Sequence, residues 1–167
     1  MKSSIKGAMK RIASYEQLKK EILADEMQSC VVTYGEGEEI SRPEYDFHAV
    51  RKAVRDIDDL IRGNRVAIHV ANTTIIVPEF ERTIGECLIL MAQLNAEKAV
   101  LESLSGKSPR TRHSRSFSGV IEWTETNYDR EECRKALRLI TDEITVLQLA
   151  LDRVNLTEII EVPDDLG

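Results

Sequence analysis

Apolar residues recur at helical spacing along most of the chain, and the clearest case lies between positions 45 and 77. Its apolar stripe advances by alternating steps of four and three residues, the spacing of a coiled-coil seam. The members of this stripe are Val50, Val54, Ile57, Ile61, Asn64, Ile68 and Ala71. The pattern predicts one helix of about 28 residues, about 42 Å long. Asn64 is the polar member of the stripe, and we expect it to set the register of packing, at an oligomer contact.

Three further helices are predicted from the same periodicity. The first covers residues 3–28, with Ile5, Ala8, Met9, Ile12, Leu18, Ile22 and Met27 around one face. Another follows Pro78 and ends near Gly106, with a stripe at Ile84, Cys87, Met91, Leu94, Lys98 and Leu101. The last begins near Thr126, with Cys133, Leu137, Ile140, Ile144, Leu147, Leu151 and Val154 in its stripe. The chain therefore contains four predicted helices.

Short extended segments separate these helices. Residues 30–34 (CVVTY) alternate and are β-branched, and residues 117–123 (FSGVIEW) contain a second such run. Ser41, Pro43 and Glu44 resemble a helix start, because serine can cap, proline fits the first turn and glutamate follows at the capping-box position. We therefore expect strands after the first and third helices, and the second helix to begin near Ser41.

The second and fourth helices repeat one another. At an offset of 83 residues, positions 45–77 and 128–160 align without a gap and are identical at 13 of 33 positions. The matches include the pairs Tyr45/Tyr128 and Asp46/Asp129, the tripeptide RKA and the pattern N-x-T-x-I. Two amphipathic helices of similar composition would share the apolar stripes, but not these polar matches in one register. The alignment indicates an internal duplication.

These features predict a mainly all-α fold, an up-down-up-down four-helix bundle made of two duplicated helix-strand-helix halves with short β segments at the bundle ends. We expect a single domain over residues 1–167, with repeat halves at roughly 1–77 and 78–162. The two N-x-T-x-I stretches would lie at the same end of the bundle and pair with each other as a small ribbon. Their Asn and Thr side chains would cap and turn the chain where each long helix stops.

Composition and charge narrow the function. Hydrophobic residues make up 42% of the chain and charged residues 31%, and the net charge of −6 excludes general binding to nucleic acid, so any polyanion contact would have to be local. Three cysteines without a CxxC pair indicate reduced thiols rather than a disulfide framework. The N-terminal stretch lacks the apolar core of a signal peptide, and the longest apolar run, CLILMA, is far too short to span a membrane. We expect a cytoplasmic protein.

One basic stretch is the strongest candidate for binding chemistry. Residues 106–116 (GKSPRTRHSRS) contain four basic residues and a histidine without any acidic residue, and the single tryptophan follows a few positions later. The candidate binding residues are Lys107, Arg110, Arg112, His113, Arg115 and Trp123. Arginine side chains on a flexible serine-rich loop suit phosphate groups, because each guanidinium donates to two oxygens. The alternative is a solvated loop that pairs with acidic surfaces of a neighbouring subunit.

Residues 111–123 (TRHSRSFSGVIEW) and the closing NLTEII resemble a family of small, uncharacterised bacterial helical proteins labelled septicolysin. The resemblance covers about residues 60–162 and implies four helices, with a basic stretch ending in SRS before a strand. It also implies an aromatic residue before the final T-T-E sequence, where this chain has Leu156. The label implies a cytolysin, but the chain shows no export signal or membrane-spanning pattern, so no lytic activity is carried over. The resemblance supplies no catalytic residues.

Other chemistry has weaker support. The first helix could lie on an anionic membrane through its basic residues Lys2, Lys6, Lys10 and Arg11. A bundle helix with a solvent-exposed face explains these residues equally well. Asp56 and Asp59 share a helix face but lack the two Glu-x-x-His pairs of a di-metal bundle site. The sequence contains no recognisable nucleophile motif or phosphate-binding glycine loop, so an enzyme is not indicated, and we expect no metal or cofactor.

The sequence thus favours a structural or interaction module that self-associates through long amphipathic helices as a homo-oligomer. The alternative function is the binding of a polyanion, either nucleic acid or a phosphate-bearing ligand, through residues 107–115. The two hypotheses differ in their dependence on the basic residues, because only polyanion binding requires them.

Overall fold

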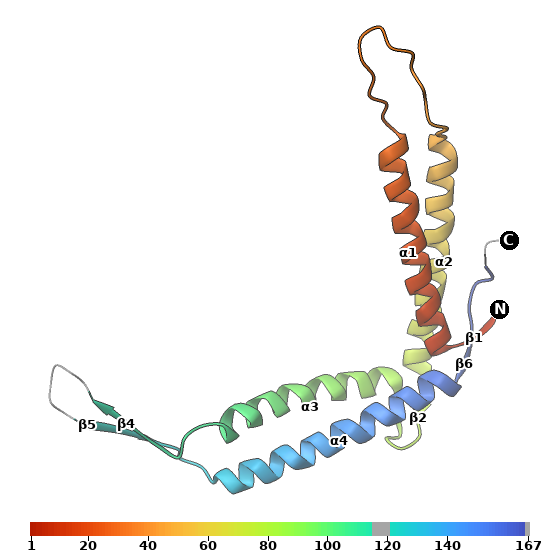
Figure 1. Ribbon diagram of the computed structural model, residues 1–167. Coiled ribbons are helices and arrows are strands. Elements are labelled where there is room, and N and C mark those ends of the chain that lie inside the picture. Colours follow the sequence, from red (N-terminus) through yellow and green to blue (C-terminus); the bar gives the residue numbers. More distant parts are fainter. Residues whose placement is uncertain (115–120, 166–167) are drawn as a thin grey trace. The chain divides into compact units, whose positions relative to one another are not determined.

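The computed structural model describes residues 1–114 and 121–165 and is mainly helical (Figure 1). The chain divides into two compact units. The first comprises Met1–Ile75 with Arg153–Gly167, and the second comprises Ile76–Asp152. Each unit is described by itself. The single domain expected over the whole chain stays a prediction.

The described residues contain four long helices and six short strands. In chain order the elements are β1 (Lys2–Ser4), α1 (Ile5–Ser29), α2 (Phe47–Thr74), β2 (Ile76–Val77), β3 (Arg82–Thr83), α3 (Ile84–Ser105), β4 (Arg110–Ser114), β5 (Ile121–Glu125), α4 (Arg130–Thr157) and β6 (Ile159–Glu161). The four predicted helices are all present, and α2 has the predicted length of 28 residues.

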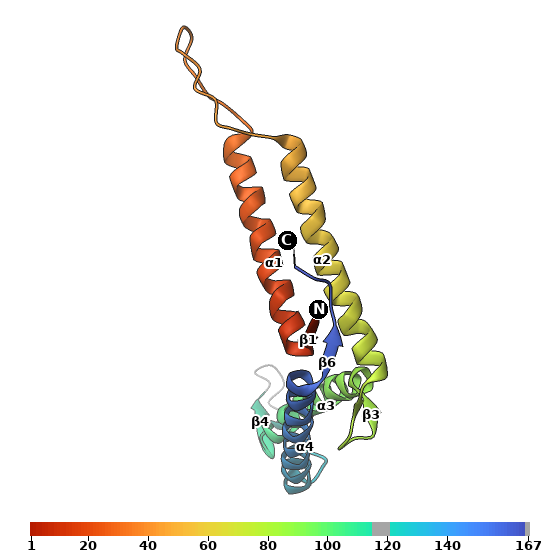
Figure 2. The same cartoon turned by 90° about the vertical axis from the view of Figure 1, so that its right-hand side faces the viewer.

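The first unit is built on an antiparallel pair of helices, α1 and α2, which pack side by side along their length (Figures 1 and 2). Every member of the predicted α2 stripe is buried or half-buried, as expected for the face that meets α1. The α1 stripe differs from the expected one. Its inward positions are Ile5, Ala8, Ile12, Tyr15, Lys19, Ile22 and Glu26. Met9, Leu18 and Met27, which the sequence placed on this face, are exposed.

Polar members of the α1 stripe find partners on α2 and just before it. The Lys19 ammonium lies 2.7 Å from the Asp58 carboxylate. Glu26 is 7% exposed, accepts a hydrogen bond of 2.9 Å from the Tyr45 hydroxyl and forms an ion pair with Arg51. Because each buried charge is paired, the stripe can carry polar residues without leaving an uncompensated charge between the helices.

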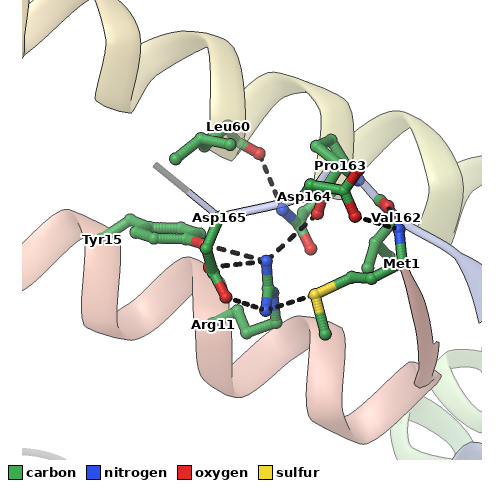
Figure 3. A network of polar contacts seen from close by, with 9 residues as sticks. Met1, Arg11, Tyr15, Leu60, Val162, Pro163, Asp164 and Asp165 are labelled. Atoms are coloured by element: carbon green, nitrogen blue, oxygen red, sulfur yellow. Dashed lines mark hydrogen bonds and ion pairs between the residues drawn. The ribbon is translucent and has the colours of Figure 1, made fainter. Parts of the chain in front are cut away.

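Residues 162–165 are clasped against the α1–α2 pair of the first unit (Figure 3). Arg11 donates a hydrogen bond of 3.1 Å to the Pro163 carbonyl and lies 2.8 Å from the Asp165 carboxylate, which also accepts from the Tyr15 hydroxyl. Pro163 lies so close to Gly63 of α2 that a Cβ at Gly63 would come 2.3 Å from Pro163 Cγ. Glycine at this position therefore allows the clasped segment to approach the helix.

The second unit contains α3, the N-terminal and central part of α4, and two β-ribbons. Figure 1 shows α3 and α4 running antiparallel. Tyr128 and Arg130 donate hydrogen bonds to carbonyls at the end of α3, and the Cys133 thiol donates to the Leu101 carbonyl at 3.5 Å. The stripes predicted on both helices are buried or half-buried, so this part of the prediction is confirmed.

Helices α2 and α4 begin and end at positions that differ by 83 residues. Asp46 and Asp129 accept hydrogen bonds from backbone amides at the two N-termini. At the two C-termini, Thr74 and Thr157 donate to the carbonyl four residues earlier. The same local interactions therefore start and stop both helices.

Three expectations about the connecting segments are wrong. Residues 31–45 contain no strand, and none of the three ladders of the described residues includes them. Helix α2 begins at Phe47 rather than near Ser41, since Asp46 caps it. The N-x-T-x-I strands do not pair with each other: β2 pairs antiparallel with β3, and β6 pairs antiparallel with β1. In each case the partner is the strand that directly precedes a long helix.

Candidate ligand-binding ribbon

Four of the predicted binding residues, Arg110, Arg112, His113 and Trp123, lie on a two-stranded antiparallel ribbon, β4–β5, in the second unit. Five residue pairs define its register, from Arg110 opposite Glu125 to Ser114 opposite Ile121. We expected a flexible loop here. Residues 110–114 instead form strand β4, so this expectation is wrong for them. Strand β5 covers the second half of the predicted 117–123 strand, and residues 117–120 lie outside the described part of the chain.

One face of the ribbon carries arginine, tryptophan and glutamate side chains. The Arg110 guanidinium lies 3.9 Å from the centroid of the Trp123 ring, and its Nε lies 2.8 Å from the Glu125 carboxylate. Arg112 is exposed and stands opposite Trp123 in the register. Stacking and ion pairing hold the Arg110 side chain flat against the ribbon, so part of its donor capacity is already used.

The opposite face of the ribbon is polar and borders an open hollow of about 560 Å³. Thr111, His113, Thr124 and the acidic Glu125 contribute from the strands. The base of the ribbon contributes Lys107, Ser108, Thr126, Asn127 and Tyr128. Hydroxyl, amide and ammonium groups of this kind can donate hydrogen bonds to the oxygens of an anion or a sugar. The hollow is within the size range of small-ligand sites.

The base of the ribbon is fixed to the helices of its own unit. The Thr126 amide donates to the Pro109 carbonyl at 3.1 Å, and the Tyr128 hydroxyl donates to the Leu104 carbonyl at 2.6 Å. The last turn of α3 and the segment just before α4 therefore hold the base of the ribbon in place.

The structure brings most of the predicted site together. Lys107, Arg110, Arg112, His113 and Trp123 lie on the ribbon or at its base, whereas Arg115 lies outside the described residues. Sequence reasoning missed the acidic residues: the register sets Glu122 opposite His113 and Glu125 opposite Arg110. The alternating sequence IEWTE could have indicated this, because a strand that pairs with the basic stretch places its glutamates opposite the basic residues.

Asn64 is fully buried in the first unit rather than exposed on a surface. Its Nδ2 donates to the Leu60 carbonyl at 2.8 Å, and its Oδ1 has no hydrogen-bond partner in the described part of the chain. Burial places this side chain in the packing of the unit itself. Its role in register stays a prediction.

The remaining candidates have ordinary structural surroundings. Asp56 pairs with Lys52 and Asp59 pairs with Arg62, each along α2. Burial raises the pKa of the Cys87 thiol above its usual value, which favours the neutral form expected of a core cysteine.

Within residues 1–114 and 121–165, no group of three or more His, Cys, Asp and Glu residues could hold a metal ion. No helix of this part of the chain is long and apolar enough to cross a membrane.

Comparison with known proteins gives a likeness of fold. No family model matches the chain, and no curated protein matches it. The structure is similar to a crystal structure of a functionally unknown conserved protein from Corynebacterium diphtheriae, with a TM-score of 0.67 and 17% sequence identity. The match covers 96% of this chain and 100% of the other. At this identity the likeness concerns the fold alone and transfers no residue role.

Proposed function

We propose that this protein is a structural or interaction module that associates with copies of itself through its helical hairpins. The observation that carries this proposal is the exposed apolar surface of the second unit. Leu88, Ile89 and Val100 of α3 are 47%, 62% and 58% exposed. Leu139, Val146 and Leu149 of α4 are also exposed. A pair of helices has no second layer to cover such side chains, and their burial in an assembly releases water from apolar surface.

Helix α3 makes the argument sharper, because apolar residues surround it. Its 22 residues carry only four charges, Glu86, Glu97, Lys98 and Glu102. A helix that is apolar on every side is normally buried on every side. Within the described residues of its unit, α3 contacts the β2–β3 ribbon and receives the hydrogen bond from Cys133 of α4, and several of its apolar side chains stay exposed.

Several finer proposals accompany this one. The up-down-up-down four-helix bundle expected within one chain remains a proposal that rests on the sequence. The matching bounds and caps of α2 and α4 support an internal duplication. Kinship with the septicolysin-labelled family and a cytoplasmic location remain proposals that rest on the sequence.

Unfolding at different protein concentrations tests self-association. Because association stabilises only the folded form, the thermal midpoint should rise as the protein concentration is increased from micromolar to several hundred micromolar. A midpoint that is independent of concentration over this range would contradict the proposal.

A second candidate function is the binding of a phosphate-bearing polyanion by the β4–β5 ribbon. The exposed Lys107 and Arg112 side chains favour it. Titration with inorganic polyphosphate should change the fluorescence of Trp123, and the affinity should fall as salt concentration rises. The double substitution Lys107→Ser/Arg112→Ser should remove this response. The matched control Lys135→Ser/Arg138→Ser, on exposed positions of α4, should retain it. A flat titration of the unsubstituted protein would exclude this candidate.

A further inference from the structure

Helix α3 carries a second seam in addition to the stripe that faces α4. Its members advance by alternating steps of four and three residues and carry no charge. They are Gly85, Ile89, Ala92, Ala96, Ala99 and Ser103. All but the half-buried Gly85 are exposed, and the seam lies about 150° around the helix from the α4-facing stripe. A helix with two such seams is built to contact two partners.

We propose that this seam, flanked by the exposed Leu88 and Val100, binds the same seam of a second copy, with the two α3 helices antiparallel. The proposal rests on the self-association proposed above and names its surface. A second copy is the favoured occupant because the seam is complementary to itself. An isologous dimer requires this property, since each residue must fit the position that a two-fold axis sets opposite to it.

The fit follows from the positions of the six residues. When the two-fold axis crosses the seam at the height of residue 94, the seam forms reciprocal layers of Gly85 with Ser103, Ile89 with Ala99, and Ala92 with Ala96. Each layer has at least one small side chain, so the helices can approach closely, and the largest residue, Ile89, meets an alanine.

The charges also permit this pairing. Beside the axis, Gln93 meets Gln93 and Asn95 meets Asn95, both as neutral amides. Towards the ends, Glu86 meets Val100 and Glu102 meets Leu88, so no like charges stand opposite each other. The seam extends over 19 residues, about 27 Å from Gly85 to Ser103. A contact of this length lies at the small end of specific interfaces, so we expect a dimer that dissociates at roughly micromolar concentration.

The first test introduces charge at the centre of the seam. Ala92→Glu/Ala96→Glu would bring four carboxylates together in the dimer, while glutamate keeps a high helix propensity. The matched control is Ala13→Glu/Ala24→Glu, at exposed positions of α1. We expect the seam variant to sediment as a monomer, with an unchanged circular dichroism spectrum, where the unsubstituted protein and the control sediment as dimers.

Cross-linking provides a test that does not depend on disrupting the seam. In a Cys30→Ser background, Asn95→Cys should be joined across the axis by a short bismaleimide, whereas Glu97→Cys, on the same helix but away from the seam, should be joined far less. Cys87 and Cys133 are buried in the native protein.

The outcomes separate the two proposals. Suppose that the unsubstituted protein is a dimer. If the seam variant is also a dimer, or if both introduced cysteines cross-link equally, self-association stands and the α3 seam is not the interface. If the unsubstituted protein is a monomer at every concentration, both proposals fall, and another part of the same chain becomes the expected cover for α3.

Discussion

Glu26 is a buried carboxylate held between a tyrosine hydroxyl and an arginine. It belongs to the inward stripe of α1, and both partners come from the segment that begins α2. The sequence did not reveal this role, because an apolar search of α1 selects Met27 and passes over Glu26. Spacing alone would have found it, since Glu26 follows Ile22 and Lys19 in the same alternation of four and three.

Substitution of Glu26 tests whether this contact stabilises the first unit. Glu26→Gln keeps a hydrogen-bond acceptor for Tyr45 but removes the charge that faces Arg51, so we expect the free energy of unfolding to fall by about 1–2 kcal/mol. Asp25→Asn, on the exposed neighbouring residue, should change it by less than about 0.5 kcal/mol. Urea denaturation measures the free energy of unfolding of both variants. Equal effects would show that the buried Glu26 contacts stabilise the unit no more than an exposed carboxylate does.

Asp165 makes the clasp of residues 162–165 dependent on pH. The hydrogen bond from Tyr15, and then those from Arg11, hold the pKa of Asp165 below its usual 3.8. The ionised carboxylate therefore stabilises the folded form above that pH, and this contribution disappears as the pH falls through the lowered pKa. At the alkaline end, burial and the bond to Asp165 raise the pKa of Tyr15 above 10.0, so its contribution is lost only as the pH rises through that raised value.

We therefore expect the stability difference between the unsubstituted protein and Asp165→Asn to be present at pH 6 and to shrink as the pH falls below 3.8 and through the lowered pKa of Asp165. Chemical denaturation at a series of pH values would measure it. A difference that stays constant from pH 6 to pH 3 would show that the clasp does not depend on the ionised Asp165.

The long helices could be predicted from sequence because local signals define them. The stripes of α2, α3 and α4 follow helical spacing, and Asp46 and Asp129 cap from adjacent positions. The pairing partners of the short strands could not be predicted in the same way. The stability of a strand depends on a partner that lies far along the chain, as for β1 and β6, and the CVVTY segment is β-prone but has no partner. The acidic side of the ribbon was missed for the same reason, because pairing brings it to the basic strand.

Matched caps allow a direct test of the two helix starts. Asp46→Ala and Asp129→Ala each remove the acceptor for two backbone amides, and each should lower the free energy of unfolding by about 1 kcal/mol. Asp142→Ala, at an exposed position in the middle of α4, should have a much smaller effect. If only one of the two cap substitutions were destabilising, the similarity of the helix starts would not extend to their energetics.

At the scale of the whole molecule, two helical hairpins account for the core of the protein and leave apolar residues uncovered on α3 and α4. Polar pairs and caps stabilise each hairpin from within, but they do not cover these residues. Association with a second copy would remove this surface from water and would explain why α3 carries two seams where contact with α4 requires one.

The molar mass in solution tests this account most directly. Sedimentation equilibrium should give a mass close to twice the 18.9 kDa of the chain at several hundred micromolar, with a reversible fall towards 18.9 kDa on dilution. A mass that stays at 18.9 kDa throughout this range would contradict the account, because the exposed faces of the hairpins would then have no second copy to cover them.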